Sequence, residues 1–231
     1  MDDCDPVVSS DHQTSPAIAL LLEQLQHVDL ALSNRAMLAL YQLGEPVIAP
    51  LMDAFPSFAR TARNHTVFIL YQIATPRAIA ALVTLLDDPD PKLRARAACY
   101  LVKTRDATAI HAAVAPLLAD LDEDSIKALG EAGDVRAVAP LLAALRATKP
   151  GFPDFFSRVA LARALGQLGD PRAIAVLEQI VRSDTVEFDA WGIGVGLSVA
   201  EVARDALQLI AARTKEQPQK TAHPWWAFWR R

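Results

Sequence analysis

Apolar residues recur at helical spacing in short segments of the chain, and polar turns separate these segments. Ala78, Leu82 and Leu86 lie four residues apart, which places them on one face of a helix. Aspartates and prolines fill positions 87–91, and helical spacing resumes at Leu93. This part of the chain therefore predicts a helix, a turn and a second helix.

The start of such a helix pair is repeated six times along the chain. Each copy has a polar residue, then proline or a substitute for it, then small and branched apolar residues. Asp, Ser or Thr can cap the free backbone N–H groups of a helix, and proline fits the first helical position because its missing donor would have no partner there. The copies occupy residues 15–18, 45–48, 75–79, 106–110, 134–138 and 170–174.

The distances between these starts give the length of one repeat. With proline or its substitute as the marker, successive starts are separated by 30, 30, 31, 28 and 36 residues. Gly44, Gly133 and Gly169 follow the second helices of three pairs, where glycine ends a helix in the left-handed conformation at little cost. The start and stop signals agree on helix pairs of about 30 residues.

A helix pair cannot bury both faces of its apolar stripe alone, so neighbouring pairs are expected to stack. We predict an all-α fold, an alpha-alpha superhelix (α-solenoid) of about six helix pairs, over residues 15–211. Residues 1–14 are predicted to be a flexible N-terminus, and residues 212–231 a polar linker with a tryptophan-rich tail. A compact bundle of the same helices is the alternative.

Composition agrees with helices and limits the choice of partner. Hydrophobic residues make up 52% of the chain but aromatic residues only 6%, a mixture that packs short helices rather than filling a β-sandwich. The formal net charge is −4, so no basic field attracts nucleic acid.

Cys4 and Cys99 support neither a disulfide framework nor a zinc site. With no export signal and no long apolar run, we expect a cytoplasmic protein.

Two segments, 168–177 and 90–98, resemble HEAT repeats, specifically the short bacterial type named after phycobilisome lyases. The resemblance implies the helix-pair architecture, and it implies protein partners more than any one chemistry. Relatives of this type include chromophore-attaching lyase subunits, phycobilisome-degradation factors and adaptors. Some HEAT-repeat proteins are hydroxylases whose His-Glu pairs bind iron, and this sequence has no His-Glu dipeptide. Others are DNA glycosylases with a basic concave surface, which the acidic charge here does not resemble.

No residue pattern predicts catalysis, a cofactor or a metal site. None of the histidines has a second His or Cys three or four residues away, and acidic turns at 87–90 and 120–124 are interpreted as helix caps rather than calcium ligands. The glycines of 191–196 lack the order of a phosphate-binding loop, and Ser198 with Glu201 predicts a capping box. The histidines are His12, His27, His65, His111 and His223.

Polar residues on the second helices form a mixed column that would line the concave face of the array. Such side chains can donate hydrogen bonds to a protein partner, or they form an ordinary solvated face. In the longer fifth repeat, Phe152, Phe155 and Phe156 either form a binding edge or, as we favour, cover the core. The column consists of Arg35, Gln42, Gln72, Arg96, Lys103, Arg163 and Gln167.

Three of the four tryptophans lie in the last seven residues. Such a tail can anchor in a groove of a partner, cap the last repeat of its own chain, or lie at a membrane surface. We favour the first two, because a short segment with few positive charges binds a bilayer weakly. The residues concerned are Trp225, Trp226, Phe228, Trp229, Arg230 and Arg231.

The function predicted from the sequence is that of a protein-binding adaptor or scaffold, not an enzyme, with no cofactor, no metal and no nucleic-acid partner. The alternative is a lyase-like or chaperone-like factor that acts on proteins carrying a bilin or another tetrapyrrole. That alternative depends on the family resemblance alone.

Overall fold

The computed structural model describes residues 15–151, 153–184, 187–188 and 197–216. The predicted flexible N-terminus and the tail residues Trp225, Trp226, Phe228, Trp229, Arg230 and Arg231 lie outside these residues. The chain divides into two compact units, Met1–Leu82 and Val83–Arg231, which are described separately.

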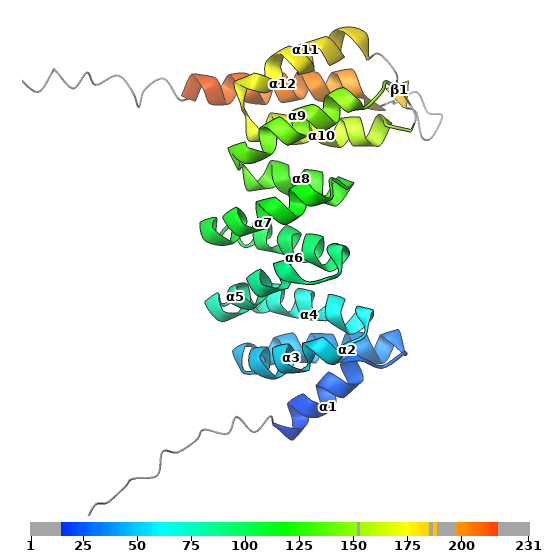
Figure 1. Ribbon diagram of the computed structural model, residues 1–231, viewed down its shortest axis with the longest axis vertical. Helices are drawn as coiled ribbons and strands as arrows, with labels where there is room; N and C mark the ends of the chain where they lie inside the picture. The colour runs from blue at the N-terminus through cyan, green and yellow to red at the C-terminus, as the bar shows by residue number, and fades with distance from the viewer. Residues whose placement is uncertain (1–14, 152, 185–186, 189–196, 217–231) are drawn as a thin grey trace, which may run out of the picture. The chain divides into compact units, whose positions relative to one another are not determined.

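In the first unit, helix pairs pack around leucines contributed by each helix. α1 packs on α2, and α2 packs on α4 (Figure 1). Leu25, Leu40, Leu51 and Leu70 are fully buried between them. The elements are α1 (Pro16–Leu25), α2 (Leu30–Leu43), the 3-10 turn η1 (Glu45–Val47), α3 (Ile48–Ala54), η2 (Phe55–Ser57), α4 (Arg60–Ile73) and most of α5 (Pro76–Thr84).

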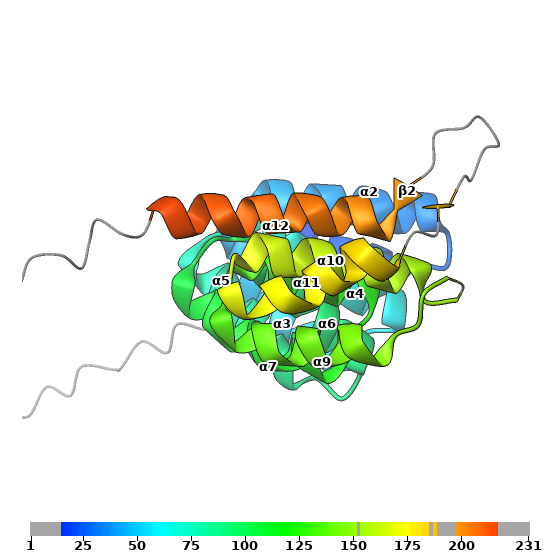
Figure 2. The ribbon, with the colours of Figure 1, turned by 90° about the horizontal axis from the view of Figure 1, so that it is seen from above.

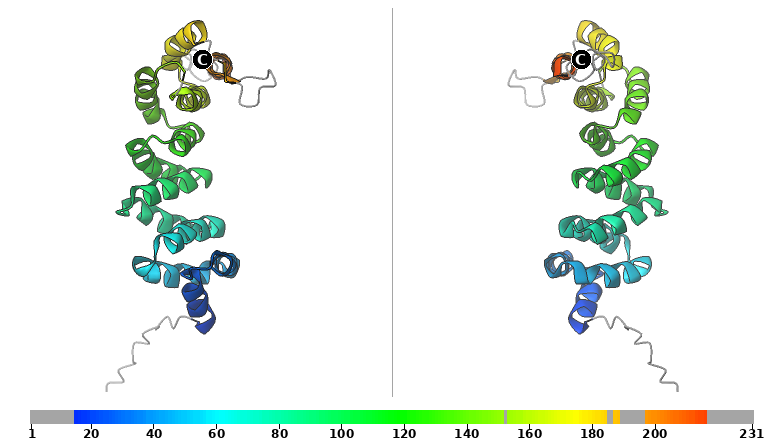
Figure 3. Two further views of the ribbon diagram at one scale, coloured as in Figure 1. Left: turned by 90° about the vertical axis from the view of Figure 1, so that its right-hand side faces the viewer. Right: turned by 90° about the vertical axis from the view of Figure 1, so that its left-hand side faces the viewer.

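The second unit has two layers of helices (Figure 3). The second helices of successive pairs, α6, α8, α10 and α12, pack one on the next, and α12 also lies along α11 (Figure 2). The elements are η3 (Leu85–Asp87), α6 (Pro91–Lys103), α7 (Ala107–Ala119), α8 (Glu123–Ala132), η4 (Val135–Ala137), α9 (Val138–Ala147), α10 (Phe155–Leu168), η5 (Pro171–Ala173), α11 (Ile174–Ser183), β1 (Glu187–Phe188), β2 (Leu197–Ser198) and α12 (Val199–Glu216). The two short strands pair antiparallel.

The predicted all-α fold of about six helix pairs is confirmed by the twelve α-helices of the described residues. Each of the six predicted starts coincides with the first turn of a helix or of a 3-10 turn that leads into one. Asp106 caps α7 by accepting from the Ala109 N–H at 2.8 Å, and Asp134 and Asp170 cap η4 and η5 in the same way. Ser15 differs, since its side chain makes no cap hydrogen bond.

Glycines serve the fold in two ways, of which the sequence predicted one. Gly133 and Gly169 end α8 and α10 in the left-handed conformation, as expected. Gly130 and Gly166 lie inside these helices, where the next second helix comes close. A Cβ at Gly166 would lie 2.7 Å from the Ala206 Cα on α12, so only glycine permits this approach.

The repeat region extends further than the sequence predicted. α12 continues to Glu216, past residue 211, where the repeat region was expected to end. Arg213 explains the difference, because its Nη1 donates to the Leu168 carbonyl oxygen at 3.1 Å and its stem covers Gly169. A long charged side chain can pack by its aliphatic part, which an apolar pattern does not reveal.

The insertion of the fifth repeat is fixed to the core at its C-terminal end. Phe155 is fully buried, as the core-covering interpretation predicts, whereas 44% of Phe156 is exposed. Phe152 lies outside the described residues. Of the predicted capping box, the structure shows the serine half, in which the Ser198 Oγ accepts from the Glu201 N–H at 3.4 Å. In the part of the chain that the structure describes, no helix is long and apolar enough to cross a membrane.

Candidate functional site

The seven predicted surface residues all lie on second helices, as the repeat pattern implied. α2 carries Arg35 and Gln42, and α4 carries Gln72. Those in the second unit are Arg96 and Lys103 on α6 with Arg163 and Gln167 on α10. Six are exposed and Gln167 is half-buried, because its side chain lies over Gly130 of α8.

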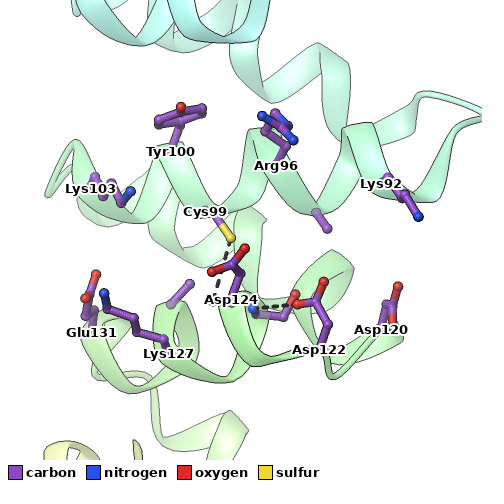
Figure 4. Close-up of a pocket in the computed structure, with 13 residues that line it drawn as sticks. Lys92, Arg96, Cys99, Tyr100, Lys103, Asp120, Asp122, Asp124, Lys127 and Glu131 are labelled. Carbon is purple, nitrogen blue, oxygen red and sulfur yellow. Dashed lines mark hydrogen bonds between the residues drawn. The ribbon is translucent and has the colours of Figure 1, made fainter. Parts of the chain in front are cut away.

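A pocket of about 360 Å³ opens between α6 and α8 (Figure 4). Of the predicted column, only Arg96 and Lys103 line it. Its volume falls in the range of about 300–1,000 Å³ that is usual for ligand pockets. This pocket is the candidate site of the second unit.

Cations line the α6 side of the pocket. Lys92, Arg96 and Lys103 follow one another at spacings of four and seven residues, which keeps them on one side of a helix. The Lys103 Nζ lies 5.2 Å from the centre of the Tyr100 ring, a cation–π contact that orients this ammonium along α6. We call these three residues the basic row.

Carboxylates line the opposite side. Asp120 and Asp122 belong to the turn before α8, and Asp124 and Glu131 lie on α8 itself, with Lys127 among them. We call the four carboxylates the acidic row. The sequence placed 120–124 among helix caps, and Asp122 does cap α8, accepting from the Ser125 N–H at 2.8 Å. Sequence reasoning missed that the other carboxylates face α6, since that requires the packing of α6 on α8.

The basic row and the acidic row lie on opposite sides of the pocket and form no ion pair with each other. Within the described part of the chain, no residue of either row forms an ion pair with another residue. Figure 4 shows the labelled cations on α6 and the labelled carboxylates across the pocket from them. The charged groups of both rows are exposed, so they are hydrated rather than paired with one another.

Small residues form the floor of the pocket. Ala95 and Ala128 are buried, Cys99 is half-buried, and the Ser125 hydroxyl is buried with no hydrogen-bond partner among the described residues. Burial, followed by the charges of Asp124 and Asp122, raises the pKa of the Cys99 thiol to about 11. At neutral pH this sulfur is a protonated thiol and a poor nucleophile.

Ser33 and His65 approach each other in the first unit but do not form an activated nucleophile. The Ser33 Oγ lies 3.1 Å from the His65 Nδ1 and donates its hydrogen to the Leu25 carbonyl oxygen at 2.8 Å. The serine oxygen therefore accepts from the histidine, which is the reverse of what a general base requires. Burial lowers the pKa of His65, so the ring is neutral at neutral pH.

Among the described residues, no group of three or more His, Cys, Asp or Glu side chains is placed to hold a metal ion.

Comparison with known families identifies the repeats. Residues 119–193 match HEAT repeats, and residues 62–88 match the PBS lyase HEAT-like repeat. These two segments are therefore similar to HEAT-type repeats, the second to the phycobilisome-lyase type, as the sequence resemblance predicted.

Two solved structures are similar to this chain. One is the complex of CpcE and CpcF of phycocyanin lyase from Nostoc sp., at 20% identity and a TM-score of 0.46, covering 90% of this chain and 80% of that one. The other is human deoxyhypusine hydroxylase in complex with glycerol, at 19% identity and a TM-score of 0.33, covering 85% of this chain and 96% of that one. A sequence comparison with curated proteins gives no significant match.

Proposed function

We propose that this protein is a cytoplasmic adaptor without catalytic activity, which binds a protein partner on the second-helix face of the unit Val83–Arg231. The observation that carries the proposal is the pocket between α6 and α8, where a basic and an acidic row face each other without forming ion pairs. Rows of charged groups on fixed helices are suited to recognising a complementary protein surface.

The unpaired charges of the pocket are better suited to recognising a partner than to stabilising the fold. Exposed ion pairs contribute only about 0–1 kcal/mol each, so leaving these groups unpaired costs the fold little. In a complex, complementary charges mainly select the partner and speed its association. The small floor residues add apolar contact area at the centre of the pocket, where binding energy usually concentrates.

The C-terminal tail is proposed as a second contact. Its tryptophans and terminal arginines are residue types that commonly dominate protein interfaces. Docking of the tail on a partner or on the chain's own last repeat is favoured over insertion at a membrane surface, because few charges support binding to lipid.

The lyase-like or chaperone-like alternative has one observation in its favour, the PBS lyase HEAT-like repeat at residues 62–88. The basic row could also pair with the carboxylates of a tetrapyrrole. Cys99 does not support covalent transfer through the pocket, because its raised pKa keeps the thiol protonated. Mixing the protein with a free bilin tests this alternative. A new absorbance band would favour the lyase-like or chaperone-like function, and an unchanged spectrum would favour the adaptor function.

Affinity capture with quantitative mass spectrometry tests the adaptor proposal. The intact chain is compared with the reversed basic row (Arg96→Glu with Lys103→Glu), with Arg146→Glu on the exposed side of α9, and with a chain that ends at Gln217. The reversed basic row is expected to lose partners that Arg146→Glu retains. Equal recovery by these two variants would contradict the proposed face.

The truncation answers a separate question. Partners lost only by the chain ending at Gln217 would assign binding to the tail. Unchanged recovery with a lower melting temperature would make the tail a cap of the last repeat. Co-sedimentation with liposomes of anionic lipid is the control for membrane contact.

A further inference from the structure

We propose that the pocket between α6 and α8 takes an amphoteric segment of a partner protein, with its carboxylates against α6 and its lysines or arginines against α8. This inference depends on the proposed adaptor function and specifies the chemistry of the partner at the same site.

The two rows run side by side along the pocket. Figure 4 shows Lys92 and Asp120 at one end of the pocket and Lys103 and Glu131 at the other, so each end has a cation on the α6 side and a carboxylate on the α8 side. Lys92 and Lys103 are separated by eleven positions, which corresponds to about 16 Å along the helix. A helical segment of about eleven residues, or an extended one of about five, would match this length.

A segment with charges of one sign fits only one side. A purely acidic segment would pair with the basic row but would bring its carboxylates to Asp124 and Glu131. A purely basic segment would be repelled by Arg96 and Lys103 in the same way. Opposed like charges at an interface cost several kcal/mol in unfavourable cases, so both single-sign segments are selected against.

An amphoteric segment satisfies both rows at once. Lys127 stands among the carboxylates of α8, so a matching segment places one acidic side chain on that side as well. Ala95, Cys99 and Ala128 line the pocket with small side chains, which leaves room for side chains to enter between the rows. The neutral Cys99 thiol adds no charge to this floor.

Reversal of each row separately makes the inference testable. One variant reverses the basic row (Arg96→Glu with Lys103→Glu), and another reverses the α8 side (Asp124→Lys with Glu131→Lys). Asp122 is left intact because it caps α8. Arg146→Glu, an exposed arginine on the first helix α9 and outside both the pocket and the predicted column, is the matched control. Circular dichroism and thermal unfolding establish that each variant is folded.

The probes are three fluorescein-labelled alanine-based helical peptides of equal length. One has glutamates on one face and lysines on the opposite face, one has glutamates only, and one has lysines only. Fluorescence anisotropy with the full chain at low salt gives each Kd, and amide NMR shifts locate each contact. Weak binding remains visible in the NMR spectra at millimolar peptide.

The amphoteric probe is expected to bind about tenfold more tightly than either single-sign probe, and to shift amides of α6 and α8. Reversal of either row is expected to weaken binding of the amphoteric probe about tenfold, whereas Arg146→Glu is expected to leave it unchanged. Added salt is expected to weaken the binding. Reversal of the α8 side is expected to lower the Kd of the probe that has glutamates only. The inference is overturned if the acidic or the basic probe binds the native chain most tightly, or if no probe shifts amides of these helices.

The same variants separate this inference from the adaptor proposal. If captured partners are lost on reversal of the basic row but gained on reversal of the α8 side, the adaptor stands and its partner is acidic rather than amphoteric. If neither reversal changes capture, the adaptor face itself is wrong.

Discussion

The buried ion pair between Arg158 and Asp184 should hold three segments of the second unit together. The Arg158 Nε donates to the Asp184 Oδ2 at 2.7 Å, and the two side chains are only 6% and 0% exposed. The Arg158 Nη1 also donates to the carbonyl oxygen and the hydroxyl of Thr148. One guanidinium thus joins the start of the fifth-repeat insertion, α10 and the end of α11.

Removal of the arginine alone should be far more costly than removal of the pair. Arg158→Met leaves a fully buried carboxylate without its charge partner, and the Asp184 Oδ1 already has no hydrogen-bond partner among the described residues. Breaking a buried pair in this way costs about 3–5 kcal/mol, whereas replacing both members by apolar residues is often neutral. Arg158→Met combined with Asp184→Leu is therefore expected to be more stable than Arg158→Met alone.

Urea unfolding followed by circular dichroism gives the free energies for this double-mutant cycle. Because the chain has two compact units, hydrogen exchange is measured as well, and the loss of protection is expected in residues 148–184. Arg163→Met, on an exposed position of the same helix, should stay within about 0.5 kcal/mol of the native chain. A cost below about 1 kcal/mol for Arg158→Met, or additive effects in the double variant, would refute the reasoning.

Three further predictions concern helix contact, thiol reactivity and acid stability. Gly166→Leu should lower the free energy of unfolding by about 1–3 kcal/mol, seen as a lower melting temperature, because its Cβ would lie 2.7 Å from the α12 backbone. In a Cys4→Ser background, alkylation of Cys99 by iodoacetamide should be slow at pH 8 and accelerate towards pH 11, because the thiol pKa is raised to about 11; fast labelling at pH 7 would contradict this. The hydrogen bond from Arg136 holds the pKa of Asp134 below its ordinary 3.8, so the stability that this carboxylate contributes is present above about pH 4 and is lost as pH falls through the lowered pKa. The difference in unfolding free energy between the native chain and Asp134→Asn should therefore shrink between pH 5 and pH 2, and a constant difference would oppose the assignment.

Local signals explain why the helix pairs could be predicted from the sequence. A cap such as Asp106 and a stop such as Gly169 act within a few residues of their own position, so each signal is legible without the rest of the fold. Apolar spacing then shows which side of each helix is buried. The same information placed the surface column on second helices.

Contacts between distant segments explain what the sequence could not predict. The close approach at Gly166 depends on Ala206, and the extension of α12 depends on Arg213 reaching Leu168. The opposed rows of the pocket likewise exist only because α6 packs on α8, some thirty residues later in the chain. The carboxylates at 120–124 could be explained locally as helix caps. The sequence therefore offered no reason to place them at a pocket.

Site-specific photo-cross-linking in the native host tests the central claim most directly. A benzophenone side chain replaces Lys103 beside the pocket or, as the control, Arg146 on α9. The adaptor account predicts that irradiation yields discrete protein adducts from position 103 and none from position 146. Adducts from position 146 with none from position 103 would contradict the account.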